Sequence, residues 1–126
     1  MSAIKHFKDL FVWQKAHELT LLVYKITDLF PRKEQFSLVD QMRRAAISIG
    51  SNIAEGFSRL SVPDKVHFFS MAKGSLTELQ NQVFVARDVG YLDDKVFIVI
   101  DDLILNVGRL LTAIMRSTRK MNNHGI

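Results

Sequence analysis

The sequence predicts an all-α protein, an antiparallel up-down four-helix bundle that forms a single domain over residues 1–126. Apolar residues recur at spacings of three and four in four long segments, which is the periodicity of amphipathic helices. Short connectors containing proline, glycine or serine separate these segments, and connectors of this length join antiparallel neighbours. The chain is 48% hydrophobic and 24% charged, a composition typical of globular domains.

The first helix is predicted over residues 10–29. Asp9 is suited to cap its start, because a short carboxylate side chain accepts hydrogen bonds from free backbone N–H groups. The pair Phe30-Pro31 ends it, since proline disfavours helical backbone in the residue before it. Trp13 and Val23 belong to the stripe that we expect to face the core.

The second helix is predicted over residues 38–56. Ser37 precedes it in a pattern similar to a capping box, with aspartate in place of the usual glutamate at the third position. Gly56 suits a C-terminal cap. Gly50 lies in mid-helix, where glycine costs about 1 kcal/mol relative to alanine, so we expect close packing or a slight bend there.

The third and fourth helices are predicted over residues 62–89 and 93–120. Ser61 repeats the capping pattern at the start of the third, and Gly90 stops it. The fourth carries an uninterrupted three-four alternation of apolar residues. Residues 121–126 are expected to be a frayed tail, as is common at chain ends.

Charge and composition limit the function classes. The formal net charge is +4, which suggests an acidic partner, although an ordinary basic domain has a similar value. No cysteine is present, so disulfides and thiolate chemistry are excluded. The apolar segment 96–115 is interrupted by Asp101 and Asp102, and ionised groups are costly in a bilayer. We therefore expect a cytoplasmic protein without a membrane span.

The apolar surface of the predicted helices is too wide for an isolated bundle. Phe97, Ile98 and Leu105 lie off the single seam of the fourth helix, and Phe68 and Phe84 lie off the seam of the third. An apolar band wider than one helix face indicates a second packing surface. The sequence therefore predicts a homo-oligomer.

No residue pattern indicates an enzyme, a metal or a cofactor. Di-iron bundles need two Glu-x-x-His motifs, and the nearest match is the single pair Asp64 and His67 at the start of a helix. Acidic pairs at 93–94 and 101–102 open the fourth helix, where negative charge stabilises the macrodipole. We therefore expect no catalytic residue, no metal ligand and no cofactor.

A row of polar side chains on the second helix has the spacing of one helix face. Such a row lies against a neighbouring helix, another subunit or a ligand. Hydrogen bonds to polar residues of the third helix are the natural pairing, because buried polar groups need partners. The predicted polar core consists of Gln41, Ser48, Asn52, Glu55, Gly74, Ser75 and Glu78.

The basic residues of the second and fourth helices are the candidates for function. Arginine suits phosphate recognition because its guanidinium group bonds two phosphate oxygens at once. A bland alternative is that these charges only complement the C-terminal end of a helix dipole. The fourth-helix patch has no interleaved aromatic residue, so base stacking is not indicated. The predicted phosphate-contacting residues are Arg43, Arg44, Arg109, Arg116, Arg119 and Lys120.

The run at 41–56, Gln-x-Arg-Arg-Ala-Ala-x-Ser-Ile-x-Ser-Asn-Ile-Ala-Glu-Gly, resembles the signature of proteins encoded within intervening sequences of bacterial 23S ribosomal RNA genes. The segments 7–16, 72–79 and 90–92 support the resemblance, which covers about residues 7–115. It implies a four-helix bundle similar to the accessory protein of diversity-generating retroelements, a pentameric barrel that binds nucleic acid and a reverse transcriptase. It implies no enzymatic activity.

Together these observations favour a non-enzymatic, oligomeric protein, by resemblance a pentamer, that contacts the phosphates of structured RNA such as ribosomal or intervening-sequence RNA. The alternative is an interaction scaffold or accessory subunit that docks a protein partner such as a reverse transcriptase. Salt separates the two, because phosphate binding weakens steeply as salt rises and apolar docking does not.

Overall fold

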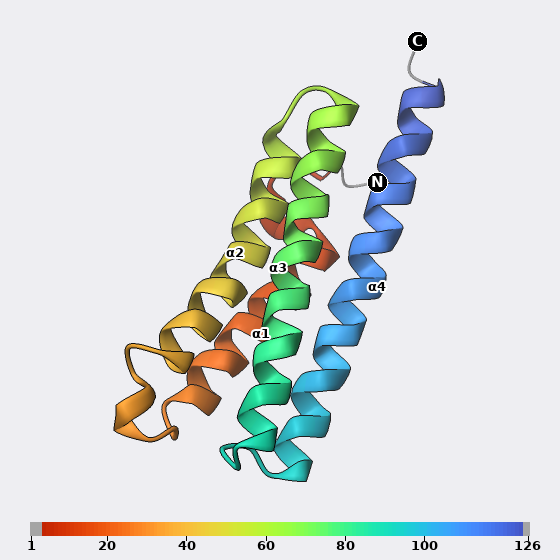
Figure 1. Cartoon of the computed structure of the whole chain (residues 1–126). Coiled ribbons are helices and arrows are strands. Elements are labelled where there is room, and N and C mark those ends of the chain that lie inside the picture. The colour runs from red at the N-terminus through yellow and green to blue at the C-terminus, as the bar shows by residue number, and fades with distance from the viewer. Residues whose placement is uncertain (1–3, 125–126) are drawn as a thin grey trace.

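The computed structural model describes residues 4–124, and all of its regular structure is helical (Figure 1). Four α-helices follow one another along the chain, with one 3₁₀ turn before the first and another between the first two. Over the described residues the chain therefore has the all-α, four-helix architecture that its periodicity predicts. The elements are η1 (Phe7–Asp9), α1 (Phe11–Thr27), η2 (Arg32–Glu34), α2 (Leu38–Ser58), α3 (Val62–Asp88) and α4 (Asp94–His124).

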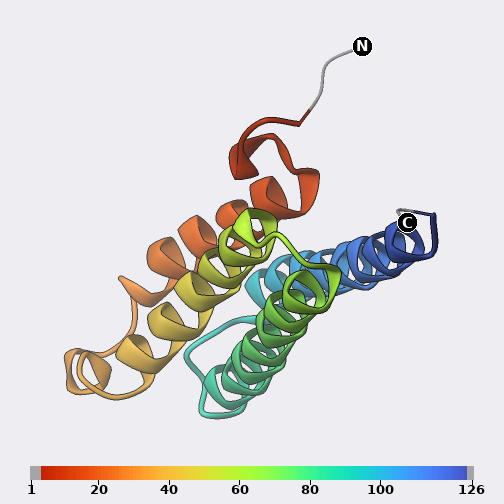
Figure 2. The ribbon, with the colours of Figure 1, turned by 90° about the horizontal axis from the view of Figure 1, so that it is seen from above.

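Each helix packs antiparallel against the next, and α4 returns to contact α1 (Figure 1). The α2–α3 interface is the most extensive and the α1–α4 interface is the least. Within the described part of the chain α2 and α4 are diagonal partners, and no Cα atom of one lies within 8 Å of a Cα atom of the other. Figure 2 looks along the bundle from the end at which α4 finishes. Side chains on α2 and α4 therefore belong to separate surfaces.

The core is one continuous apolar cluster to which all four helices contribute. Leu19 of α1, Ile49 of α2, Leu79 of α3 and Leu111 of α4 are completely buried. Burying one such side chain contributes about 1.5–3 kcal/mol, so the cluster supplies the main driving force for folding. The apolar stripe of each helix faces this cluster, as the periodicity predicts.

Helix ends show where local signals succeed and fail. Ser61 caps α3 by accepting a hydrogen bond from the Asp64 N–H (3.2 Å), and Gly90 ends that helix with a φ of +91°, as expected. Ser37 makes no capping bond with its side chain, so the predicted capping box is absent. Asp9 accepts bonds from the Lys5 and His6 N–H groups and closes η1, so it does not cap α1.

The helices differ in length from the prediction at their ends. The structure begins α1 one residue later than expected and ends it two residues earlier. It extends α2 to Ser58 and α4 to His124. Residues 121–124, which we expected to fray, continue α4, and 125–126 lie outside the described residues.

Gly56 is part of the last turns of α2 and does not cap it. A Cβ atom at this position would lie 2.6 Å from Cε1 of Phe69, whose side chain is 2% exposed. Glycine is therefore favoured here by the close approach of α2 to the Phe69 ring of α3. A Cβ on Gly74 would meet nothing within 4 Å, so no close helix approach requires glycine there.

The turns at the far end of the bundle are fastened to each other. The Tyr91 hydroxyl, in the α3–α4 turn, donates a hydrogen bond to Oε2 of Glu34 in η2 (2.6 Å). Hydrogen bonding to Glu34, followed by burial and the negative charge of that residue, raises the pKa of Tyr91 above its ordinary value. The Phe30 ring packs against the Tyr91 ring, with centroids 5.2 Å apart.

The helices of the described residues are not suited to a bilayer. None of them has the length and apolarity that a membrane span requires.

Candidate nucleic-acid interface

A row of basic side chains follows the solvent-facing side of α4. Arg116 comes seven residues after Arg109, and Lys120 comes four residues later. These spacings place the three on one helix face, about 10 Å and 6 Å apart along the axis. All three are exposed, and none of them forms an ion pair with another described residue.

Two further cations widen this row toward α3. The Lys73 ammonium donates a hydrogen bond to Oγ1 of Thr112 (3.0 Å), which places a lysine of α3 beside α4. Arg119 follows Thr112 by seven residues and so lies on the same side of the helix. We call Lys73, Arg109, Arg116, Arg119 and Lys120 the basic face.

Lys73 was not among the residues predicted from the sequence. It lies alone among neutral residues of α3, so its local sequence carries no signal. The antiparallel pairing of α3 with α4 could have identified Lys73, because this pairing places residue 73 opposite residue 112. No acidic residue follows Asp102 along the chain, so α4 supplies no neutralising partner of its own beyond that point.

The helix dipole does not account for the basic face. Because α4 continues to His124, Arg109 lies more than four turns and Arg116 more than two turns before its end. The dipole acts within about the last turn of a helix. Only Lys120 lies close enough to be explained by it. Interaction with the helix dipole thus explains only Lys120 among the α4 residues of this face.

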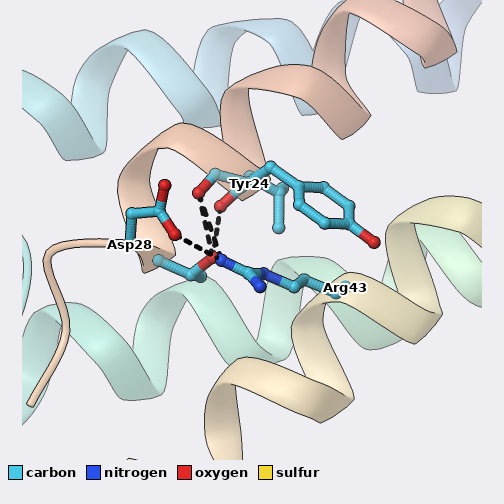
Figure 3. Close-up of polar contacts among 5 residues, drawn as sticks. Tyr24, Asp28 and Arg43 are labelled. Carbon is cyan, nitrogen blue, oxygen red and sulfur yellow. Dashed lines mark hydrogen bonds and ion pairs between the residues drawn. The ribbon is translucent and has the colours of Figure 1, made fainter. Parts of the chain in front are cut away.

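Arg43 is half-buried and its guanidinium group already has partners at the end of α1, so it is a weaker candidate for phosphate contact than the sequence predicts (Figure 3). Its Nε donates to Oγ1 of the buried Thr27 (3.0 Å), and its Nη2 donates to the Tyr24 carbonyl oxygen (3.4 Å) and to Oδ1 of Asp28 (3.0 Å). The guanidinium also lies over the Tyr24 ring, 4.5 Å from its centroid. Arg43 therefore ties α2 to the end of α1.

Arg44 is exposed but carries no free charge. Its Nε bonds Oδ2 of Asp40 one turn earlier (3.0 Å), and 79% of its side chain is accessible. It also lies on α2, which is diagonal to α4 among the described residues. The structure therefore separates the two α2 arginines from the basic face, and the six predicted residues do not form one site.

The polar row of α2 meets α3 at its centre only. The Ser48 and Ser75 hydroxyls are 2.8 Å apart, and the Asn52 amide donates to the Ser48 carbonyl oxygen (2.9 Å) and hydroxyl (3.1 Å). All three side chains are half-buried. The bond between Ser48 and Ser75 is the interhelical hydrogen bond that we expected between α2 and α3, and Asn52 holds Ser48 from within α2.

The outer members of the predicted polar core are on the surface. Gln41, Glu55, Gly74 and Glu78 are exposed, and Glu55 forms an ion pair with Arg59 (3.1 Å). The prediction that they are internal is wrong: Gln41 and Glu78 line an open groove between α2 and α3, and Glu55 and Gly74 lie on the surface outside it.

The comparisons with known proteins agree with this architecture. The family model described as 23S rRNA-intervening sequence protein matches residues 8–113 of the chain. The chain belongs to this family. The matched range begins in η1 and ends within α4, so this family of 23S rRNA-intervening sequence proteins covers nearly the whole bundle, including the basic row up to Arg109.

A solved structure shows the same fold. The chain is 23% identical to a protein of unknown function from the S23 ribosomal protein family of Bacteroides thetaiotaomicron, with a TM-score of 0.78. The similarity covers 86% of this 23S rRNA-intervening sequence protein and 98% of the other chain. No curated protein sequence matches the chain.

Proposed function

We propose that this 23S rRNA-intervening sequence protein is a non-enzymatic RNA-binding protein that holds backbone phosphates on its basic face. The observation that carries the proposal is the alignment of Arg109, Arg116 and Lys120, which are exposed, unpaired among the described residues and mostly beyond the reach of the helix dipole. The family's association with ribosomal RNA genes makes structured RNA the favoured ligand.

The chemistry of the basic face suits the phosphates of a nucleic acid. Guanidinium groups bond phosphate oxygens in pairs, and each contact releases condensed counterions from the RNA. Contacts of this kind position a protein on a nucleic acid without reading its sequence. We therefore expect binding that depends strongly on salt and weakly on sequence.

Removal of two charges from the basic face tests the proposal. The full-length protein is titrated into a fluorescein-labelled RNA hairpin at several salt concentrations, and binding is followed by fluorescence anisotropy. The double variant Arg116→Ala, Lys120→Ala is expected to lower the slope of log K against log salt by about 1.4–1.8, since each phosphate contact contributes about 0.7–0.9. At 0.1 M salt this corresponds to about 25- to 60-fold weaker binding.

A charge-matched control separates the basic face from net charge. Arg32→Ala with Lys33→Ala also removes one arginine and one lysine, but from η2 at the opposite end of the bundle (Figure 1). This variant is expected to retain the wild-type slope to within the small effect of net charge. Equal losses in the two double variants would show that only total charge matters, and absence of wild-type binding at low salt would refute RNA binding altogether.

We also propose that the protein assembles from several copies of itself, with a ring-like pentamer expected from the family resemblance. Apolar side chains remain exposed on the outer sides of α3 and α4: Val85 is 43% exposed, Ile98 57%, Val99 58% and Leu105 44%. Covering them would remove an unfavourable apolar surface. Light scattering after size exclusion is expected to give a multiple of 14.4 kDa at micromolar concentration, and a monomer mass would refute the assembly.

The same apolar surface also fits one other function. An accessory protein that docks a protein partner, such as a reverse transcriptase, would use Ile98 and Leu105 in place of the basic face. Its binding would persist or tighten as salt rises. Salt-insensitive capture of such a partner, combined with no affinity for RNA, would favour this alternative.

A further inference from the structure

A groove between α1 and α2 is independent of the basic face and of the α2–α3 hydrogen bonds. Its volume is about 330 Å³, and its lining is mostly apolar. Gly50, Ser51 and Ala54 form one side, and because their side chains are small, that side is shallow and flat. The groove is lined by Phe7, Trp13, His17, Thr20, Ile47, Gly50, Ser51 and Ala54.

The other side of the groove is aromatic. The rings of Trp13 and His17 stack with centroids 4.7 Å apart and planes inclined by 12°. The Phe7 ring lies 5.3 Å from that of Trp13 at a steep angle. Planar faces of this kind are the surfaces on which unpaired nucleobases stack, whatever their sequence.

Polar groups at the edge of the groove have no partner among the described residues. Neither Nε1 of Trp13 nor the Ser51 hydroxyl forms a hydrogen bond with another described residue, although both line the groove. An alanine at position 50 would place its Cβ in ordinary contact with Trp13 Nε1 (3.6 Å). The protein's own packing therefore does not require Gly50, and its lack of a side chain keeps the groove open beside the indole N–H.

The groove lies in the same half of the bundle as the basic face. The chain starts α1 at the end where α4 finishes (Figure 1), and both helices contribute to that half. Lys5 and Lys8 flank Phe7, are exposed and form no ion pair with a described residue. The Gln14 amide donates to the Lys8 carbonyl oxygen (2.8 Å) and so holds η1 against α1. Two lysines thus lie next to the aromatic end of the groove.

We propose that this groove takes an unpaired base of the RNA whose backbone lies on the basic face. The aromatic faces, the free edge groups, the volume and the neighbouring lysines each fit a nucleobase attached to a phosphate chain. The inference rests on the proposed function. It also predicts that the protein prefers unpaired RNA to duplex RNA. The bases of a duplex are stacked in the helix and cannot enter the groove, whereas a loop or single strand presents them.

The single tryptophan of the chain is a direct probe of the groove. The full-length protein is titrated with a ten-nucleotide oligouridylate and, separately, with a duplex RNA of the same length. Trp13 emission and the anisotropy of the labelled RNA are followed in parallel. The single strand is expected to quench Trp13 emission, with the same titration midpoint as the anisotropy curve. The duplex is expected to bind through the basic face without quenching.

A groove-filling variant tests the site without removing the probe. Ser51→Leu puts a larger side chain into the groove and is expected to abolish the quenching and weaken oligouridylate binding by about 5- to 150-fold, the range for loss of one stacked base. Asn81→Leu places the same side chain at an exposed position of α3 and is expected to change neither readout. Circular dichroism checks that both variants are folded.

Each other outcome overturns the inference in a recognisable way. RNA binding that depends on Arg116 and Lys120 but leaves Trp13 emission and the Ser51→Leu affinity unchanged would refute the groove and leave the proposed function intact. No binding of either RNA would refute both. A Trp13 emission that changes on dilution without RNA would show that a second copy of the chain fills the groove.

Discussion

Replacement of Gly56 by alanine is expected to destabilise the protein, although alanine is the better helix former. In α2 the change from glycine contributes about 1 kcal/mol of stability through helix propensity. Against this, the new Cβ would lie 2.6, 2.8 and 3.1 Å from Cε1, Cδ1 and Cζ of Phe69. This ring is buried and has no free volume to enter, so overpacking costs about 1–3 kcal/mol. The net effect is a loss of about 0–2 kcal/mol.

Gly74 provides the matched control. It is also a helical glycine, and a Cβ there would meet nothing within 4 Å, so Gly74→Ala is expected to gain about 1 kcal/mol. The two variants should therefore differ by about 1–3 kcal/mol, or roughly 4–12 °C in Tm for a chain of this size. The difference isolates the steric cost because propensity contributes equally to both.

Urea unfolding followed by circular dichroism at 222 nm measures both variants at one protein concentration, because assembly would make stability depend on concentration. In a Phe69→Leu background, which lacks the outer ring atoms, Gly56→Ala is expected to be less harmful. Equal stability of Gly56→Ala and Gly74→Ala would show that the α2–α3 contact is not tight at this point and would refute the reasoning.

Three further expectations concern the contacts between elements. Arg43→Met removes charged hydrogen bonds at a partly exposed site and is expected to lower the free energy of unfolding by about 1–2 kcal/mol, measured with urea, while RNA affinity stays unchanged. A loss of affinity without a loss of stability would show that Arg43 contacts the RNA. Ser48→Ala is expected to cost about 0.5–1.5 kcal/mol, and Ser48→Ala with Ser75→Ala less than the sum of the single changes, because no hydroxyl is then left unpaired. Additive losses would contradict the direct bond. Because the pKa of Tyr91 is raised in the folded protein, the unfolded chain loses the hydroxyl proton of Tyr91 at a lower pH. The stability that the Tyr91 hydroxyl contributes is therefore present below about pH 10 and is lost as pH rises through the folded pKa. The absorbance of ionised tyrosine at 295 nm is expected to lose its highest-pH component in Tyr91→Phe, and an unchanged titration would contradict the contact with Glu34.

The failed local predictions have a common cause. Glycine at 56 and glycine at 74 look alike in the sequence, and both were assigned by local rules. One is needed because the Phe69 ring of another helix fills the space beside it, and the other faces open space. Neither fact depends on neighbours in the chain. The same holds for Ser37, whose side chain makes no capping bond although its sequence context resembles a capping box.

The candidate site shows this limit more strongly. Arg43 and Arg44 are adjacent in the sequence, yet one is fixed by Thr27 and Asp28 of another segment and the other is paired on the surface. Lys73 joins the basic face only through its contact with α4. No aromatic residue is interleaved with the fourth-helix cations in the sequence. The fold brings the cluster around Trp13 into the same half of the molecule.

The sequence by itself determined the helical architecture, the approximate limits of the four helices, the apolar stripes and the family. These properties depend on periodicity and on residues close together in the chain, so the linear sequence is enough to predict them. Tertiary structure alone decided which cations are free and which glycine packs against another helix. It also decided that an aromatic groove accompanies the basic face. Each of these depends on which side chains meet across helices, and that is fixed by the packing of the whole core.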